Sequence, residues 1–125
     1  MRNPFIVLAL PLLVGAGHDL SSRANVNLAP LISSEDYPPS ALRSGAQGSV
    51  GFVLDIGPDG RVANCTIESS SGTPALDSTT CRLLTARGLF TPARDRRGRP
   101  TTDRIHSRIR WALPQMTPPP PSTPS

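Results

Sequence analysis

Hydrophobic and polar residues alternate in two neighbouring segments of the chain. Every second residue is hydrophobic from Ser49 to Ile56, and the alternation resumes from Arg61 to Ser69. A period of two is typical of half-buried strands. The intervening residues 57–60 read Gly-Pro-Asp-Gly, which favours a tight turn, so the two strands are predicted to form an antiparallel hairpin. In the second strand, we expect one face to hold Ala63, Cys65 and Ile67.

A helix is predicted over residues 74–87. Its hydrophobic positions follow helical spacing, and Thr73-Pro74 offers an N-cap oxygen followed by a proline that the first turn tolerates. Gly88 is placed to end the helix. Residues 93–102 are predicted to form a basic loop.

The alternation returns from Asp103 and predicts a third strand. One face holds Ile105, Ser107, Ile109, Trp111 and Leu113, whereas the other holds Arg104, His106, Arg108 and Arg110. The order strand, strand, helix, strand predicts an α+β fold, a two-layer β-β-α-β sandwich. A small antiparallel sheet packs one face on the helix and turns the other toward water.

The segments that flank this core differ from it in composition. Residues 1–17 carry one arginine, an apolar run and small residues, the layout of a signal peptide or a short signal-anchor. Residues 18–36 show no sustained period and are predicted to be a linker, and residues 115–125 a proline-rich disordered tail. The folded domain is therefore expected over residues 37–114, in an exported protein.

Length and charge limit the number of domains and the classes of partner. A chain of 125 residues has room for one small domain. All thirteen basic residues are arginine, and the formal net charge is +4. Such a chain is attracted to polyanions in general, so the charge alone does not choose a partner.

The two cysteines, Cys65 and Cys81, are most simply interpreted as a structural disulfide between the second strand and the helix. Export favours this interpretation because disulfides persist in oxidising compartments. The alternatives are a redox pair or a metal site, but the sequence has no Cys-x-x-Cys motif.

We find no candidate active site in the sequence. His18 and His106 have no catalytic partner at recognisable spacing, and no carboxylates are paired for acid–base work. The sequence therefore predicts no catalytic residue, no metal ligand, no cofactor and no enzymatic activity.

The arginine-rich face of the third strand allows more than one interpretation. It can be a solvated edge whose charges pair with Asp55 and Glu68 and discourage aggregation. It can instead accept an extended peptide, with arginine side chains that select acidic or polar partners. Nucleic acid is not an expected partner, because surface aromatic residues for base stacking are scarce.

The order of these motifs resembles the C-terminal domain of TonB energy transducers, over about residues 37–114. The resemblance rests on Tyr37-Pro38, Gln47-Gly48, the turn Asp59-Gly60 with the residues around it, Ser71-Gly72, Leu76-Asp77 and the final strand to Trp111. The residues of the family motif are Tyr37, Pro38, Gly48, Asp59, Gly60 and Gly72. The cysteine pair resembles a variant found in one branch of the family.

The resemblance implies a periplasmic domain, tethered or not to the inner membrane, that captures the TonB box of an outer-membrane receptor as an added strand. The ExbB/ExbD motor would then supply force for siderophore or vitamin uptake. The expected peptide-binding residues are Arg104, Ile105, His106, Ser107, Arg108, Ile109 and Arg110. The alternative is a structural protein whose arginines hold anionic polymer or another partner without energy coupling. Exposed edges could also pair two copies into a homodimer.

Overall fold

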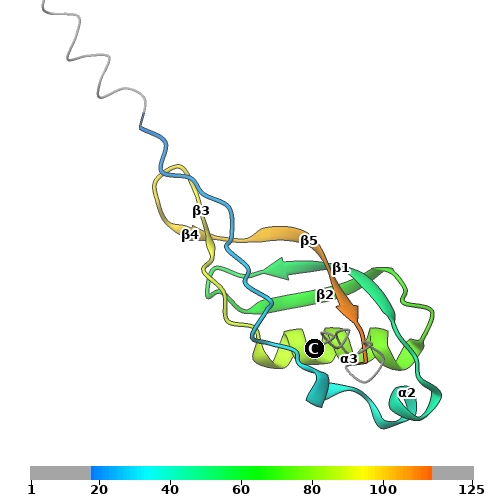
Figure 1. Ribbon diagram of the computed structural model, residues 1–125. Coiled ribbons are helices and arrows are strands. Elements are labelled where there is room, and N and C mark those ends of the chain that lie inside the picture. The colour runs from blue at the N-terminus through cyan, green and yellow to red at the C-terminus, as the bar shows by residue number, and fades with distance from the viewer. Residues whose placement is uncertain (1–17, 114–125) are drawn as a thin grey trace, which may run out of the picture.

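The computed structural model describes residues 18–113, which form a three-stranded antiparallel sheet with a helix packed on one face (Figure 1). The predicted α+β fold is confirmed. The expectations for residues 1–17 and 115–125 lie outside the described residues. Between residues 18 and 113, no helix has the length and apolar character needed to cross a membrane. The elements in chain order are η1 (Ser34–Asp36), α2 (Pro39–Ser44), β1 (Gly48–Ile56), β2 (Val62–Ser69), α3 (Pro74–Arg87), β3 (Ala93–Arg94), β4 (Pro100–Thr101) and β5 (Asp103–Trp111).

Strand β1 is the centre of the sheet, with the order β2-β1-β5. Its pairing with β5 is uninterrupted from Gly48 opposite Trp111 to Ile56 opposite Asp103. The alternation predicted for β1 is confirmed, because its inward side chains are almost completely buried: Val50, Phe52, Leu54 and Ile56. The alternation of β5 is confirmed as well, with the arginines and His106 exposed and the intervening residues half-buried or buried.

Strand β2 departs from the predicted alternation. Val62 is buried, whereas Ala63 is exposed, so the expectation that Ala63 shares a face with Cys65 is wrong. The physical reason is a β-bulge: Ile56 lies opposite Val62 but Asp55 lies opposite Asn64, which leaves Ala63 without an opposite residue. A second register shift occurs near Ser69.

Helix α3 spans the predicted residues and covers the inner face of the sheet, as Figure 1 shows. The buried side chains of this helix include Leu76, Thr80, Leu83 and Leu84. The Thr73 side chain was expected to cap the helix, but it forms no capping hydrogen bond. Asp77 instead accepts hydrogen bonds from the backbone amide and hydroxyl of Ser71, at 2.9 and 2.7 Å, so the first turn is fixed to the preceding loop.

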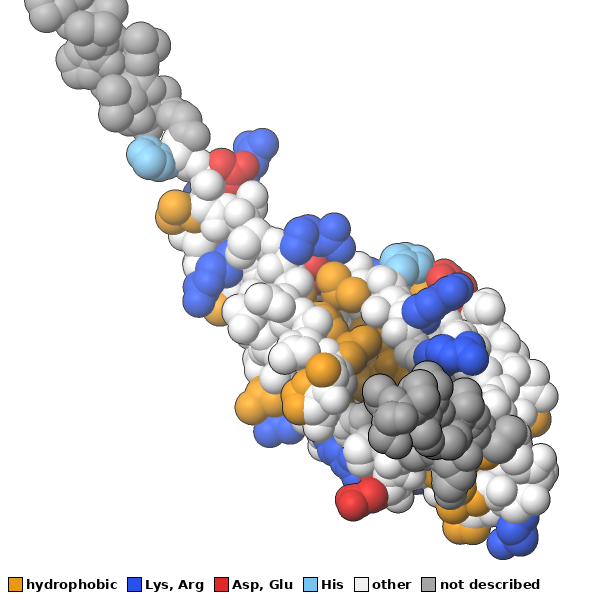
Figure 2. Space-filling model, in the orientation of Figure 1, with side chains coloured by type: hydrophobic (Ala, Val, Ile, Leu, Met, Phe, Trp, Pro, Cys, Tyr) orange, Lys and Arg blue, Asp and Glu red, His pale blue; other side chains and the backbone are white. Residues whose placement is uncertain are grey.

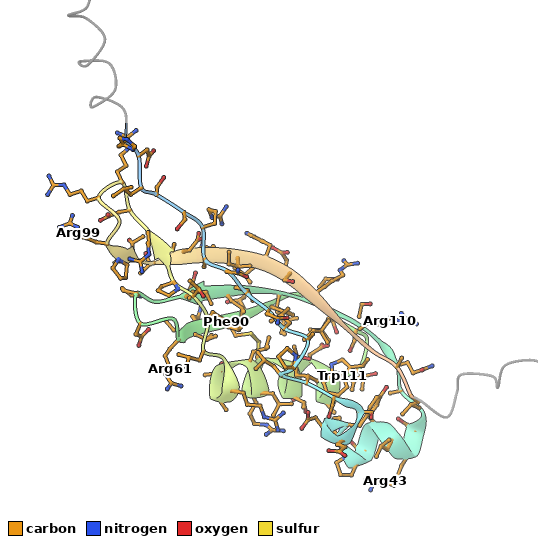
Figure 3. The ribbon with its side chains drawn as sticks, turned by 60° about the vertical axis from the view of Figure 1, so that its left-hand side comes forward. Arg43, Arg61, Phe90, Arg99, Arg110 and Trp111 are labelled. Atoms are coloured by element: carbon orange, nitrogen blue, oxygen red, sulfur yellow. A yellow bond between two sulfur atoms is a disulfide. The ribbon has the colours of Figure 1, made fainter. Side chains whose placement is uncertain are left out.

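The end of β5 is fixed to the helix through Trp111 (Figure 3). The indole Nε1 donates a 2.9 Å hydrogen bond to Thr80 Oγ1, which in turn donates to the carbonyl of Leu76. The Trp111 ring also contacts Tyr37 edge-on, with centroids 5.1 Å apart. A fully satisfied polar group inside the core fixes the position of the strand, because an unpaired buried donor would be costly.

The predicted linker residues 18–36 lie against the domain. Ser22 forms a bridge to Arg94 and Asn25 forms one to Thr91. Three side chains at alternate positions, Ala24, Val26 and Leu28, are half-buried against the core. This segment therefore extends the core beyond the predicted boundary, because its apolar side chains shield the open side of the two layers from water.

The basic segment over residues 93–102 is a short hairpin and not an irregular loop. Strands β3 and β4 pair Ala93 with Thr101 and Arg94 with Pro100. Asp95 orders the turn, because its carboxylate accepts from the amides of Arg97 and Arg99, each at 2.9 Å. The expectation of a loop without strands was wrong because an aspartate can build a turn through hydrogen bonds to its own neighbours.

Candidate functional site

One edge of the sheet is left open along β5. The strand is hydrogen-bonded to β1 on one side, and no described strand pairs with its other side. Within residues 18–113, no backbone-to-backbone hydrogen bond joins Ile105–Arg110 to any segment besides β1. The Arg104 carbonyl accepts a single side-chain hydrogen bond, 3.0 Å from Arg23 Nη2. The Arg104 amide in turn donates to the Asp103 carboxylate at 2.8 Å. The outward amides and carbonyls of β5 beyond Arg104 are therefore available to another chain.

The charges on the outer face of β5 fall into two halves. In the first half, Arg104 pairs with Asp55 at 2.8 Å and His106 Nδ1 lies 3.0 Å from Glu68. The Arg104 hydrogen bond lowers the pKa of Asp55. In the second half, Arg108 and Arg110 are exposed and form no ion pair with any described residue. The unpaired positive charge is thus concentrated near the end of the strand.

A groove of about 310 Å³ lies beside this second half. One wall comes from the segment that precedes η1, and the other comes from the end of β5. Hydrophobic side chains are visible in the hollow between these segments in Figure 2. Its lining residues combine apolar, aromatic and basic side chains: Leu28, Ala29, Ile32, Ser33, Ser34, Tyr37, Arg108, Ile109, Arg110, Trp111 and Ala112.

The outer wall of the groove is held by Arg87, the last residue of α3. Its guanidinium donates to the Leu31 carbonyl at 2.8 Å and forms a two-bond ion pair with Asp36. The Asp36 carboxylate also accepts from the amide of Ser33, which closes a capping box around η1. The hydrogen bonds from Arg87 and Ser33 lower the pKa of Asp36 to about 2.

The substitution Asp36→Asn should remove a pH-dependent contribution to stability. The folded pKa of Asp36 lies below its ordinary value of 3.8, so the ion pair contributes fully above about pH 4 and is lost as the pH falls toward 2. In urea unfolding, the wild type should therefore be more stable than the variant at pH 6, and the two should converge near pH 2. The matched control is Glu35→Gln on the same short helix, where no ion pair is described. An equal effect of the two variants would contradict this role of Asp36.

Residues 33–113 match the family described as "Gram-negative bacterial TonB protein C-terminal". The chain belongs to this family. Two relatives are the proteins named "Protein TonB" from Xanthomonas campestris pv. campestris, strains B100 and ATCC 33913. Each is 39% identical to this chain over 64 residues, which cover 51% of this chain and 26% of the relative.

The residues that were expected to form the family motif lie mainly in the scaffold of this TonB C-terminal domain. The Tyr37 hydroxyl donates to the Ala46 carbonyl, and Pro38 precedes α2. Asp59 and Gly60 form the turn between β1 and β2, Gly48 begins β1, and Gly72 lies in the loop before α3. Of the six, Tyr37 also lines the groove beside β5.

The disulfide between Cys65 and Cys81 is present, with the Cα atoms 5.6 Å apart. It joins β2 to α3, so it lies at the sheet edge opposite β5. Among residues 18–113, no group of three or more histidine, cysteine, aspartate or glutamate side chains is arranged to hold a metal ion. The cysteine pair thus connects the two layers and is separate from the open edge.

The sequence reasoning identified the β5 side of the groove but missed the opposite wall. Leu28 and Ile32 lie in the segment that was interpreted as a linker. The signal was present in the alternation of Ala24, Val26 and Leu28, which is the pattern of an extended segment with one apolar face. It spans only five residues, and Pro30 follows two residues after its end.

Proposed function

We propose that this domain binds an extended peptide by adding it as a strand to the free edge of β5. The observation that carries the proposal is the regular, unpaired edge of β5 with a groove of apolar, aromatic and basic side chains beside its second half. The backbone of Arg104 to Arg110 would pair with the peptide, and alternate peptide side chains would enter the groove. Arg108 and Arg110 would orient the peptide through an acidic residue.

The opposite edge of the sheet is a poorer acceptor. Strand β2 contains two register shifts, and such bulges bend a strand and interrupt the spacing of its hydrogen-bonding groups. Strand β5 pairs without a shift over nine residues. A peptide that adds to β5 can therefore keep one continuous register, which the edge of β2 does not offer.

The wider role that we propose follows the family and its two relatives. The peptide would be the TonB box of an outer-membrane receptor, and the protein would act in the periplasm in energy-dependent transport of siderophores or vitamins. Coupling to an ExbB/ExbD motor and tethering to the inner membrane belong to this proposal. The domain would act by binding and not as an enzyme.

A second candidate is attachment to an anionic polymer without energy coupling, which the basic face favours. The two candidates differ in what the partner must supply. Strand addition requires peptide amides in a fixed register, whereas attraction to a polyanion requires only charge and fades steeply with salt.

Titration with a set of N-methylated peptides should distinguish them. The starting peptide has about ten residues, is extended and apolar, and bears one acidic residue. N-methylation of an amide that faces β5 removes a hydrogen bond and blocks close approach, whereas methylation of its neighbours leaves the pairing intact. The dissociation constant should therefore rise at every second position along the peptide, by on the order of tenfold or more. Amide shifts of the protein should cluster in β5.

The double variant Arg108→Glu/Arg110→Glu should weaken binding of the acidic peptide and spare a peptide in which the acidic residue is replaced by glutamine. The matched control is Arg43→Glu/Arg82→Glu, which changes the net charge of the chain by the same amount but at α2 and α3. A uniform effect of N-methylation, or equal losses in both double variants, would contradict strand addition at β5. Sedimentation without peptide would show whether the edge pairs two copies of the chain instead.

A further inference from the structure

The β3–β4 hairpin forms a basic tip at one end of the domain (Figure 1). Arg94, Arg96, Arg97 and Arg99 lie on it within six residues and are all exposed. The only acidic residue in this stretch is Asp95, which forms the turn and an ion pair with Arg99 at 3.1 Å. The side chain of Arg96 is 87% exposed, and its nearest acidic oxygen, on Asp19, is 3.9 Å away. Arg97 forms no ion pair with any described residue.

A leucine accompanies these arginines at the tip. Leu20 is 54% exposed and lies next to the turn residue Gly98. Its amide donates to the Arg96 carbonyl at 3.0 Å, and Ser22 exchanges two backbone hydrogen bonds with Arg94. The tip is therefore an ordered unit that presents an apolar side chain among guanidinium groups. This combination suits the boundary between lipid headgroups and acyl chains.

The tip is also close in sequence to the most hydrophobic segment of the chain. Phe5 to Val14 is an apolar run, and Val14 is six residues from Leu20. Six residues span at most about 20 Å, so a bilayer that holds the apolar run would lie within reach of the hairpin. The groove beside β5 is at the other end of that strand, roughly 30 Å away for nine extended residues. Contact at the tip would leave the groove accessible.

We propose that the hairpin tip, with Leu20, Arg96 and Arg97 at its centre, docks on a membrane surface that carries anionic phospholipid headgroups. The arginines attract the phosphates and Leu20 enters the interface. This interaction holds the domain in a fixed orientation, with the groove at the far end of β5 away from the bilayer. It is independent of the peptide proposed above, since none of these three residues lines the groove.

The test is flotation of the full chain with vesicles of phosphatidylcholine, with and without phosphatidylglycerol. The measured quantity is the ratio of the two partition coefficients, because the apolar run acts on both kinds of vesicle and its contribution cancels. The variant Arg96→Gln/Arg97→Gln should lower this ratio by about fivefold for each arginine removed. The ratio for the wild type should also decrease as salt is added.

The matched control is Arg43→Gln/Arg82→Gln, which removes the same charge from α2 and α3. It should leave the ratio unchanged within about twofold, because these arginines lie on other elements. Thermal unfolding of both double variants shows whether the fold is retained; the hairpin substitutions remove no backbone contact. A wild-type ratio near one, or equal losses in the two double variants, would overturn the proposal.

Discussion

The substitution Gly60→Ala should destabilise the domain by about 3 kcal/mol, which combines the cost of a left-handed residue with the loss of a backbone hydrogen bond. Gly60 has a φ of 83°, which an alanine adopts only with strain. A Cβ atom at this position would clash with the Phe90 carbonyl oxygen. Because the neighbour is backbone, the chain must move, and the 2.8 Å hydrogen bond from the Phe90 amide to the Gly60 carbonyl would be disturbed.

The matched control for this prediction is Gly72→Ala. Gly72 also has a positive φ, 94°, but no heavy atom lies within 4 Å of the position that its Cβ would take. This substitution should lower the free energy of unfolding only by the cost of a left-handed alanine, about 1–2 kcal/mol. Denaturant unfolding of both variants measures the difference. Equal losses would mean that the approach of Phe90 to the turn contributes nothing to stability.

Removal of the disulfide should have an effect of similar size. The double variant Cys65→Ser/Cys81→Ser opens a covalent loop with a sequence separation of 16. Without the bridge, the unfolded chain has a higher conformational entropy, which lowers the free energy of unfolding by about 3 kcal/mol in the chain-entropy model. The bridge joins β2 to α3, so its loss also removes the covalent connection between the layers.

Reduced wild-type protein is the control for the disulfide prediction. It should unfold at the same lower denaturant concentration as the double variant, because both lack the same bond. Each single variant should be as unstable as the double variant, since one cysteine cannot form the bridge. The folded fraction should still bind peptide, because β5 lies at the opposite edge of the sheet. A double variant as stable as the oxidised wild type would contradict a stabilising role.

Much of the fold could be predicted from local patterns. The alternation in β1 and β5 identifies the inward faces, since consecutive side chains of a strand point to opposite sides. The Pro58-Asp59-Gly60 turn and the proline at the start of α3 mark where elements end and begin. These features depend on neighbours within a few residues, which a sequence displays directly.

The candidate site was predicted only in part. The prediction of seven peptide-binding residues on β5 rests on its arginine-rich face, interpreted as that of an edge strand, and on the resemblance to the TonB family. That the edge of β5 is regular, whereas β2 contains bulges, depends on how two strands pair, and the sequence of either strand alone does not specify it. The second wall of the groove depends on Arg87, which reaches Asp36 and Leu31 across more than fifty positions of the chain.

The sequence by itself determined the order of the three long strands and helix α3, the faces of β1 and β5, the turn at Gly60 and the membership of the TonB family. Only the tertiary structure decided that residues 24–32 cover the core, that Trp111 bonds to Thr80, and that a groove lies beside the free edge. The physical reason is the range of the forces involved. Backbone conformation responds to adjacent residues, whereas burial and hydrogen bonding between distant segments arise only when the chain has closed on itself.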